Sequence, residues 1–233
     1  MSYPRRDAAD LPAVDESAMR EVDRRMVEEV GIDLPRMMEN AGRHLADVAV
    51  TMFAPRHVVV LYGSGGNGGG ALVAARHLVN RGVEVTLVPS SGALTPVPAV
   101  QHAILERMGV LESAGRTPPS CDVVIDGMVG YSLSGSPSGR VAELVGWAGA
   151  QKAPVLSLDV PTGFSAASGT TASPHITAAA TVTLGLPKAG LVGNAAAGRL
   201  YLADISVPPI VWADMALDVP RDLFAPGQVL QLV

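Results

Sequence analysis

A run of apolar β-forming residues that feeds a loop almost without side chains constrains the fold of this chain more than any other feature. Residues 58–62 read VVVLY, and six of the eight residues from Gly63 to Gly70 are glycine. The segment from Ala71 to Asn80 has the apolar spacing of a helix, and Gly82 follows it. A buried strand, a tight loop and a helix in this order predict an α/β fold, because the helix of such a unit covers the strand that precedes it.

The same alternation of strand and helix patterns continues along the chain. Two amphipathic helices come first, starting near Asp15 and Asp33, and we expect them to pack on a sheet formed by later residues. Short connections between alternating elements indicate a mostly parallel sheet with right-handed crossovers. Further strands are predicted at residues 83–88, 123–126, 155–159, 180–184 and 200–205, and further helices at residues 97–108 and 140–150.

The domain organisation is simple, since the chain contains no internal repeat, low-complexity block or obvious linker. We therefore expect one domain. Its predicted parts are an N-terminal arm at residues 1–14, the domain itself at residues 15–208, and a C-terminal tail at residues 209–233 that packs on the domain or extends from it.

The composition limits the classes of partner. The 233 residues carry a formal net charge of −5, the pI is about 5.5, and no cluster of Lys and Arg stands out. A nucleic acid is therefore not expected as a partner. The single cysteine, Cys121, excludes an internal disulfide. No apolar segment is long enough to span a bilayer, and no secretory signal follows Arg5 and Arg6, so we expect a cytoplasmic protein.

The glycine loop has the spacing of a nucleotide-binding loop. Gly63, Gly65 and Gly68 satisfy G-x-G-x-x-G, and a helix that starts after such a loop favours a phosphate at its N-terminus. We interpret the loop as one that contacts phosphate, because two or three glycines would suffice for a tight turn without a ligand. A dehydrogenase would also have an acidic residue at the end of the next strand, but that end reads LVPSS and Glu84 lies at its beginning. The sequence therefore argues against hydride transfer.

Two aspartates follow predicted strands and should reach the same edge of the sheet as the glycine loop. Asp126 ends DVVID, and Asp159 ends VLSLD. An isolated aspartate in this position is more often a cap for its loop, but two beside a glycine loop favour a site. Hard cations prefer oxygen ligands, which Asn67, Asp126 and Thr162 offer on the three converging loops. The histidines show no paired spacing typical of a metal site.

These features occur together in one known family. The chain resembles the YjeF N-terminal domain family, the NAD(P)H-hydrate epimerases, from about Asp15 to Pro208. The resemblance implies a Rossmann-like three-layer α/β/α sandwich that is often a homodimer. It also implies epimerisation at C6 of hydrated NADH or NADPH, a damaged form of the cofactor. The segments in which the resemblance to the family lies are MREVDRRMVEEVGIDLPRMMENAGRHLA, GSGGNGGGALVAARHL, DVVIDGMVGYSLSG, LSLDVPTGFSAASG and TVTLGLPKAGLVGNAAAGRLYLADISVP.

The resemblance also implies a role for each site residue. Asn67, Asp126 and Thr162 would hold a potassium ion, and Asp159 would assist proton transfer at the nicotinamide end. Residues expected to contact the dinucleotide are Gly66, Asn67, Gly68, Gly69 and Gly70 along its phosphates, and Gly130, Tyr131, Ser132, Leu133, Ser134, Gly135 and Ser136 around it. The dehydratase domain that is fused to some family members is not expected within 233 residues. A separate dehydratase would then complete the repair.

The glycine loop departs from the family pattern G-x-G-N-N-G-G-D-G at two positions. Gly66 stands where the family has an asparagine, and Gly70 stands where it has an aspartate. A lost charged contact is worth roughly 1.5–3 kcal/mol. The alternative hypothesis is therefore a relative without epimerase activity that acts as a binding or scaffold protein, or on a different substrate in specialised metabolism. Lys188 matches a family lysine, and we expect it to lie at the surface or brace its loop.

Overall fold

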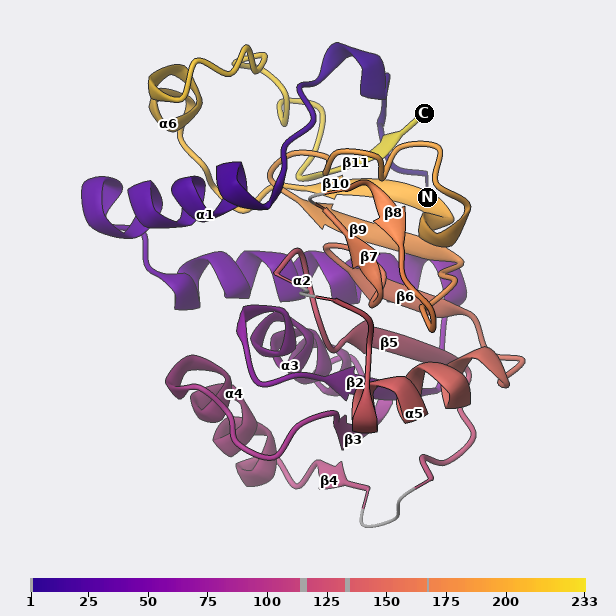
Figure 1. The fold of residues 1–233 in the computed structure, drawn as a ribbon. Coiled ribbons are helices and arrows are strands. Elements are labelled where there is room, and N and C mark those ends of the chain that lie inside the picture. Colours follow the sequence, from indigo (N-terminus) through magenta and orange to yellow (C-terminus); the bar gives the residue numbers. More distant parts are fainter. Residues whose placement is uncertain (1, 114–116, 133–134, 167) are drawn as a thin grey trace.

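A computed structural model describes residues 2–113, 117–132, 135–166 and 168–233. Its centre is one large sheet in which all neighbouring strands are parallel except β10 and β11 (Figure 1). The order across the sheet is β1 (Arg5–Arg6), β11 (Val229–Leu232), β10 (Arg199–Ala203), β9 (Ala180–Leu184), β6 (Val155–Leu158), β5 (Val123–Gly127), β2 (His57–Tyr62), β3 (Glu84–Pro89) and β4 (Leu111–Glu112). A small separate sheet pairs β7 (Phe164–Ser165) with β8 (Thr170–Thr171).

The first two α-helices begin directly after aspartates that cap them. The Asp15 side chain caps α1 by accepting from the backbone of Ala18, and Asp33 caps α2 in the same way through Arg36. No helix in the described part of the chain has the length and apolar character needed to cross a membrane. The helices are α1 (Glu16–Arg25), α2 (Leu34–Phe53), α3 (Gly66–Val79), α4 (Pro96–Arg107), α5 (Gly139–Gly149) and α6 (Pro209–Asp214).

The central strands are covered on both sides, which confirms the three-layer α/β/α sandwich. Val58 and Val60 of β2 pack in one hydrophobic cluster with residues of α2 and α3. Val59 and Leu61 of the same strand pack with Leu144 of α5. Successive side chains of a strand point to opposite faces, so the two helical layers lie on opposite sides of the sheet. Figure 1 shows α3 and α5 on either side of β2.

The first helices are held within this chain by their apolar side chains. Met19, Val22 and Met26 are at most 2% exposed, and Leu45 of α2 is fully buried. Their apolar faces are therefore core, not a surface left free for a second subunit, and the homodimer stays a prediction.

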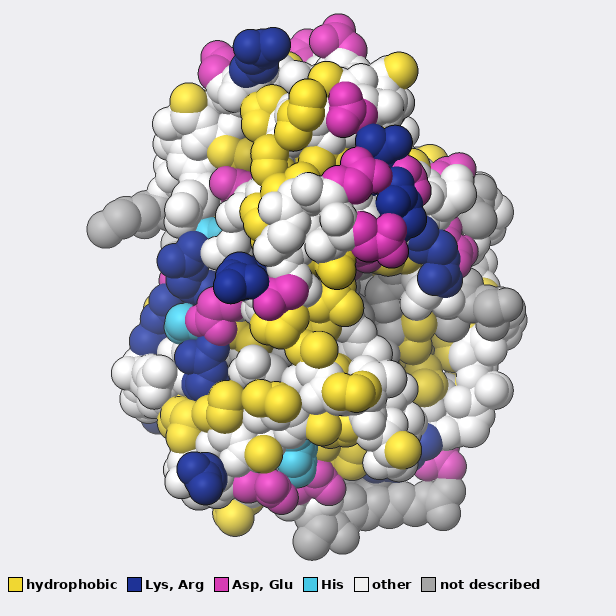
Figure 2. All heavy atoms as spheres, turned by 90° about the vertical axis from the view of Figure 1, so that its left-hand side faces the viewer, with side chains coloured by type: hydrophobic (Ala, Val, Ile, Leu, Met, Phe, Trp, Pro, Cys, Tyr) yellow, Lys and Arg dark blue, Asp and Glu magenta, His cyan; other side chains and the backbone are white. Residues whose placement is uncertain are grey.

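Figure 2 shows a band of hydrophobic side chains across one face of the molecule, with acidic and basic side chains mixed beside it.

The two ends of the chain meet at one edge of the sheet. Strand β1, within the predicted N-terminal arm, pairs in parallel with β11 near the C-terminus. Val14 then forms a bridge to Lys188, with Val14 N donating to Pro187 O and Ala189 N donating to Val14 O. The residues before α1 therefore fix the loop that carries Lys188.

The sheet also determines where a ligand can enter. From β2 the chain moves to β3 and β4 on one side, and β5 then returns to the other side of β2. The order of strands thus reverses between β2 and β5. In an open parallel sheet, the crevice beyond the carboxyl ends of the strands at such a reversal is the usual ligand site.

Candidate active site

The glycine loop after β2 is packed against the protein itself. A Cβ atom on Gly63 would lie 1.9 Å from the carbonyl oxygen of Met128, and one on Gly68 would lie 1.9 Å from the carbonyl oxygen of Gly63. Side chains also approach Gly69 and Gly70, with Met38 Sδ at 2.6 Å from the first Cβ position and Leu158 Cδ2 at 2.7 Å from the second. Internal packing therefore accounts for four of the six glycines.

This packing also explains an error in the predicted helix start. Helix α3 begins at Gly66, not at Ala71, so most of the loop glycines belong to its first turns. Each helical glycine costs roughly 1 kcal/mol relative to alanine, which is why helix propensity indicates a later start. The close contacts that only glycine permits offset this cost. Gly65 differs, because nothing lies within 4 Å of its Cβ position.

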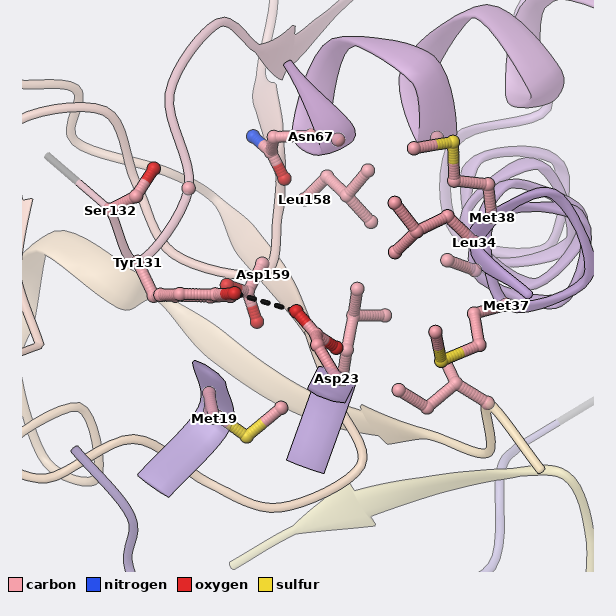
Figure 3. Close-up of a pocket in the computed structure, with 16 residues that line it drawn as sticks. Met19, Asp23, Leu34, Met37, Met38, Asn67, Tyr131, Ser132, Leu158 and Asp159 are labelled. Carbon is pink, nitrogen blue, oxygen red and sulfur yellow. Dashed lines mark hydrogen bonds between the residues drawn. The ribbon is translucent and has the colours of Figure 1, made fainter. Parts of the chain in front are cut away.

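A pocket of about 150 Å³ opens between the glycine loop, α1, α2 and the ends of β6 and β9. Figure 3 shows Asn67 at one side, Met37 and Met38 of α2 at another, Met19 of α1 at a third, and Asp23, Tyr131 and Asp159 close together. One end of the pocket is thus polar and the rest is largely apolar. The lining residues are Met19, Asp23, Leu34, Met37, Met38, Ala41, Gly66, Asn67, Gly70, Gly130, Tyr131, Ser132, Leu158, Asp159, Leu184 and Ile205.

Behind the pocket lies the fully buried carboxylate of Asp126. Its Oδ1 accepts from Thr162 Oγ1 at 2.6 Å, and its Oδ2 accepts from Thr162 N at 2.8 Å and from Ser157 Oγ at 2.9 Å. Burial raises the pKa of Asp126, and the hydrogen bonds from Thr162 and Ser157 oppose that rise. The donors named here are all neutral, so they stabilise the carboxylate without compensating its charge.

Asn67 lies over the same loop. The Cβ position of Gly130 is 3.2 Å from Asn67 Cγ and Oδ1, and that of Gly127 is 3.3 Å from the Asn67 carbonyl oxygen. The Asn67 amide nitrogen is buried and has no hydrogen-bond partner among the described residues. A buried N–H donor without a partner is rare and often marks a place where an acceptor atom of a ligand or a water completes the bonding.

Asp159 occupies the polar end of the pocket in an unusual conformation. It follows β6 with a φ of +65°, in the left-handed region, and its backbone N–H donates to Val182 O at 2.7 Å. Residues held in this region are strained by roughly 1–3 kcal/mol and cluster at functional sites. The side chain is 3% exposed. The backbone therefore directs the carboxylate into the pocket.

Lys188 lies against Asp159 and is fully buried, so the expectation of a surface position is wrong. Its Nζ is 2.5 Å from Asp159 Oδ1. The contact lacks the alignment of a hydrogen bond, and Lys188 Nζ donates instead to the carbonyl oxygens of Leu184 at 2.8 Å and Leu186 at 3.3 Å. The two carbonyls fix the ammonium group beside the carboxylate, and they also brace the loop after β9.

A second carboxylate faces the same end of the pocket. Asp23 comes from α1, and its Oδ2 accepts a hydrogen bond of 2.7 Å from Tyr131 Oη (Figure 3). Burial raises the pKa of Asp23, and repulsion from Asp159 adds to the rise, whereas Tyr131 and Lys188 oppose it. The pKa of Tyr131 is raised as well, by burial and by the neighbouring Asp23.

Comparison with known proteins agrees with this geometry. The model of the family described as YjeF-related protein N-terminus matches residues 35–190. The NAD(P)H-hydrate epimerase of Dehalogenimonas lykanthroporepellens is 42% identical over 222 residues, which cover 92% of this chain and 90% of that protein. The chain belongs to the YjeF N-terminus family. The crystal structure of yeast ynu0 has the same fold, with a TM-score of 0.76 and 24% identity over 95% of this chain and 100% of the yeast chain.

Other YjeF relatives are longer. The bifunctional NAD(P)H-hydrate repair enzyme Nnr of Hyperthermus butylicus is 34% identical over 192 residues, which cover 77% of this chain but 36% of that enzyme. The NAD(P)H-hydrate epimerase of Truepera radiovictrix is 35% identical and is matched over 87% of its length. The chain thus matches most of the length of these two relatives named as epimerases, and about a third of the length of this bifunctional enzyme.

The predicted site residues of this YjeF domain fall into three groups. Those that line the pocket are Gly66, Asn67, Gly70, Gly130, Tyr131, Ser132 and Asp159. Those that are buried outside it are Gly68, Gly69, Asp126 and Thr162, and those that lie exposed beyond it are Gly135 and Ser136. Leu133 and Ser134 lie outside the described residues.

Sequence reasoning missed Asp23 and misjudged Lys188. Asp23 lies four residues after Met19 and three before Met26, so a carboxylate sits within the apolar spacing of α1. That interruption is a signal, because a charged residue among buried positions needs a partner or a function. Lys188 follows the carboxyl end of a predicted strand, which is the edge where sites form.

Proposed function

We propose that this protein epimerises the R and S forms of hydrated NADH and NADPH. The observation that carries the proposal is the position of Asp159, a buried carboxylate with left-handed backbone geometry that lines the pocket beside the glycine loop. The names of the relatives that this chain matches along most of their length support the same activity. The pocket joins an apolar part that suits a nicotinamide ring to a polar end that suits proton transfer.

Asp159 is the proposed proton-transfer group at C6 of the hydrated nicotinamide. A carboxylate held within reach of the reacting atom contributes roughly 10²–10⁴-fold to a proton-transfer step. Lys188 supports this role, because its ammonium group compensates the charge of Asp159 and holds the carboxylate in one orientation. The buried position of both groups protects this ion pair from screening by bulk water.

Potassium is the proposed cation of the site, held by Asn67, Asp126 and Thr162. The donors fit a hard monovalent cation, since they offer an amide oxygen, a carboxylate and a hydroxyl. The fully buried charge of Asp126 supports this assignment, because its hydrogen-bond donors are neutral. When bound, the ion would supply a positive charge that keeps Asp126 ionised and draws the three loops together.

The dinucleotide is proposed to lie between the start of α3 and the loop after β5. Gly66 and Asn67 line the pocket at the N-terminus of α3, where backbone N–H groups and the helix dipole favour a phosphate. Gly130, Tyr131 and Ser132 face them from the opposite loop. This arrangement leaves the apolar part of the pocket, with Asp159 at its polar end, for the nicotinamide ring.

A dehydratase is the proposed functional partner. The bifunctional repair enzymes that match this chain extend well beyond the matched region, so their additional length has room for a second activity. We propose that a dehydratase takes the S hydrate that this domain produces. The two would act in sequence on the same cofactor.

A coupled assay tests the proposed function. R-hydrated NADPH, free of the S form, is mixed with an S-specific dehydratase, and the regenerated NADPH is followed by its absorbance. We expect this protein to accelerate the regeneration well beyond spontaneous epimerisation. A rate equal to the spontaneous one would refute the proposal. Such a result would favour the alternative hypothesis, in which the glycines at Gly66 and Gly70 leave the site without epimerase activity.

A further inference from the structure

We infer that Asp23 is a second catalytic residue of this site, which protonates the leaving oxygen of the substrate while Asp159 accepts a proton from the incoming water. The inference rests on the proposed epimerase function and deepens it. It assigns Tyr131 as the positioning residue that holds Asp23 in place.

The position of Asp23 sets it apart from the other acidic residues of α1. Glu16 and Glu21 bond to arginines on the solvent side of the helix, whereas Asp23 lines the pocket. Its partner is Tyr131, whose hydroxyl donates to one carboxylate oxygen at 2.7 Å. That bond leaves the other carboxylate oxygen of Asp23 available to a substrate. In Figure 3 Asp23 and Asp159 approach the polar end of the pocket from different elements.

The chemistry of epimerisation at a hydrated carbon gives two such groups a use. The C6–O bond breaks with its electron pair on oxygen, the carboxyl group of Asp23 protonates that oxygen, and water leaves. The lone pair of N1 forms a C6=N1 iminium. Water then attacks the opposite face of C6 and passes a proton to the Asp159 carboxylate. Both side chains return to their starting forms by exchanging protons with solvent, and in the reverse direction their roles are interchanged.

The surroundings of Asp23 suit its role as the acid, with Asp159 as the base. The groups that face it are Tyr131 from the loop after β5, Asp159 after β6, Lys188 after β9, and Arg20 on its own helix. Lys188 pairs with Asp159, and Arg20 bonds to Glu16, so neither cation is committed to Asp23. Burial raises the pKa of Asp23, which favours the protonated form that an acid needs. Two neighbouring carboxylates with different surroundings are the usual arrangement for an acid and a base.

The test compares the rate of R-to-S conversion across pH for the wild type, Asp23→Asn, Tyr131→Phe and the control Glu28→Gln. We expect Asp23→Asn to lower kcat by about 100-fold with little change in KM, and its pH profile to lose one of two limbs. Tyr131→Phe should shift that same limb, because Asp23 remains but loses its hydrogen bond. Glu28→Gln, which removes an exposed carboxylate beyond the end of the same helix, should behave as the wild type.

The possible outcomes separate this inference from the proposed function. Wild-type kcat in Asp23→Asn would overturn the inference alone, as would a lower kcat with both limbs of the pH profile intact. If Asp23→Asn fails to fold, Tyr131→Phe decides, and an unshifted profile in that variant overturns the inference. An inactive wild type would overturn both proposals.

Discussion

Lys188 and Asp159 form a fully enclosed ion pair, with Nζ 2.5 Å from Oδ1 and exposed side-chain fractions of 0% and 4%. The two residues come from loops after different strands, β9 and β6, so the pair ties one side of the pocket together. The segment before α1 also helps to hold the ion pair in place, because Val14 pairs with the backbone around Lys188. The stability of the fold and the orientation of the proposed proton-transfer group therefore depend on the same contact.

Replacing Lys188 by methionine should destabilise the protein strongly. Removal of one partner leaves the other charge buried without compensation, which costs roughly 3–5 kcal/mol. The free energy of unfolding, measured with urea, should fall by that amount, and the double variant with Asp159→Asn should recover part of it. Lys152→Met serves as the control, because Lys152 is exposed. An equal effect of the two lysine substitutions would contradict the ion-pair account.

Two glycines of the loop should differ in how much stability their replacement by alanine costs. Alanine stabilises a helix interior by roughly 1 kcal/mol over glycine. At Gly68 the new Cβ meets the Gly63 carbonyl oxygen, so we expect a net loss of roughly 1–3 kcal/mol. At Gly65, which has a φ of −101° and open space around it, the substitution should change stability little. Urea unfolding of both variants measures the difference, and a stabilised Gly68→Ala would show that packing does not require this glycine.

Potassium should stabilise the folded protein through Asp126. An ion that binds only the folded state at tenfold its dissociation constant adds about 1.4 kcal/mol. We expect thermal unfolding in potassium chloride to occur at a higher temperature than in tetramethylammonium chloride at equal ionic strength. Asp126→Asn should abolish this difference, whereas Asp218→Asn at an exposed position should keep it. A potassium effect that survives in Asp126→Asn would place the ion elsewhere.

The pH dependence of stability should reveal the raised pKa of Asp23. Because its pKa is raised in the folded protein, the folded state holds this proton more tightly than the unfolded chain does. The resulting stabilisation is fully present below the ordinary aspartate pKa of about 3.9 and is lost as pH rises through the raised pKa. Relative to Asp23→Asn, the wild type should therefore lose stability as pH rises from acidic to neutral. Parallel unfolding curves for the two proteins would argue against a raised pKa.

The strand ends were predictable because each buried strand is a compact apolar run with a polar residue after it. Asp126 and Asp159 both follow such runs, and a parallel sheet brings them to one edge. Local sequence also identified the cap Asp15 and the helix start near Asp33, since a helix start depends on neighbours a few residues away.

The contacts that depend on distant segments were not predictable in this way. The buried state of Lys188 requires the bridge to Val14, and lysine is among the residues that are least often buried. The number of loop glycines favoured a phosphate as the explanation, but the tight contacts of Gly63 and Gly69 come from Met128 and Met38. Only the assembled fold shows which atoms those positions face.

The most direct test of the account is the ratio of R to S hydrate after pure R-hydrated NADPH is mixed with the wild type or Asp159→Asn. Chromatographic separation of the two forms measures this ratio over time without a coupling enzyme. We predict rapid approach to the equilibrium ratio with the wild type, and a rate at least about 100-fold lower with a folded Asp159→Asn variant. Equal rates for the two proteins would contradict the central claim that Asp159 carries the proton transfer of epimerisation at C6.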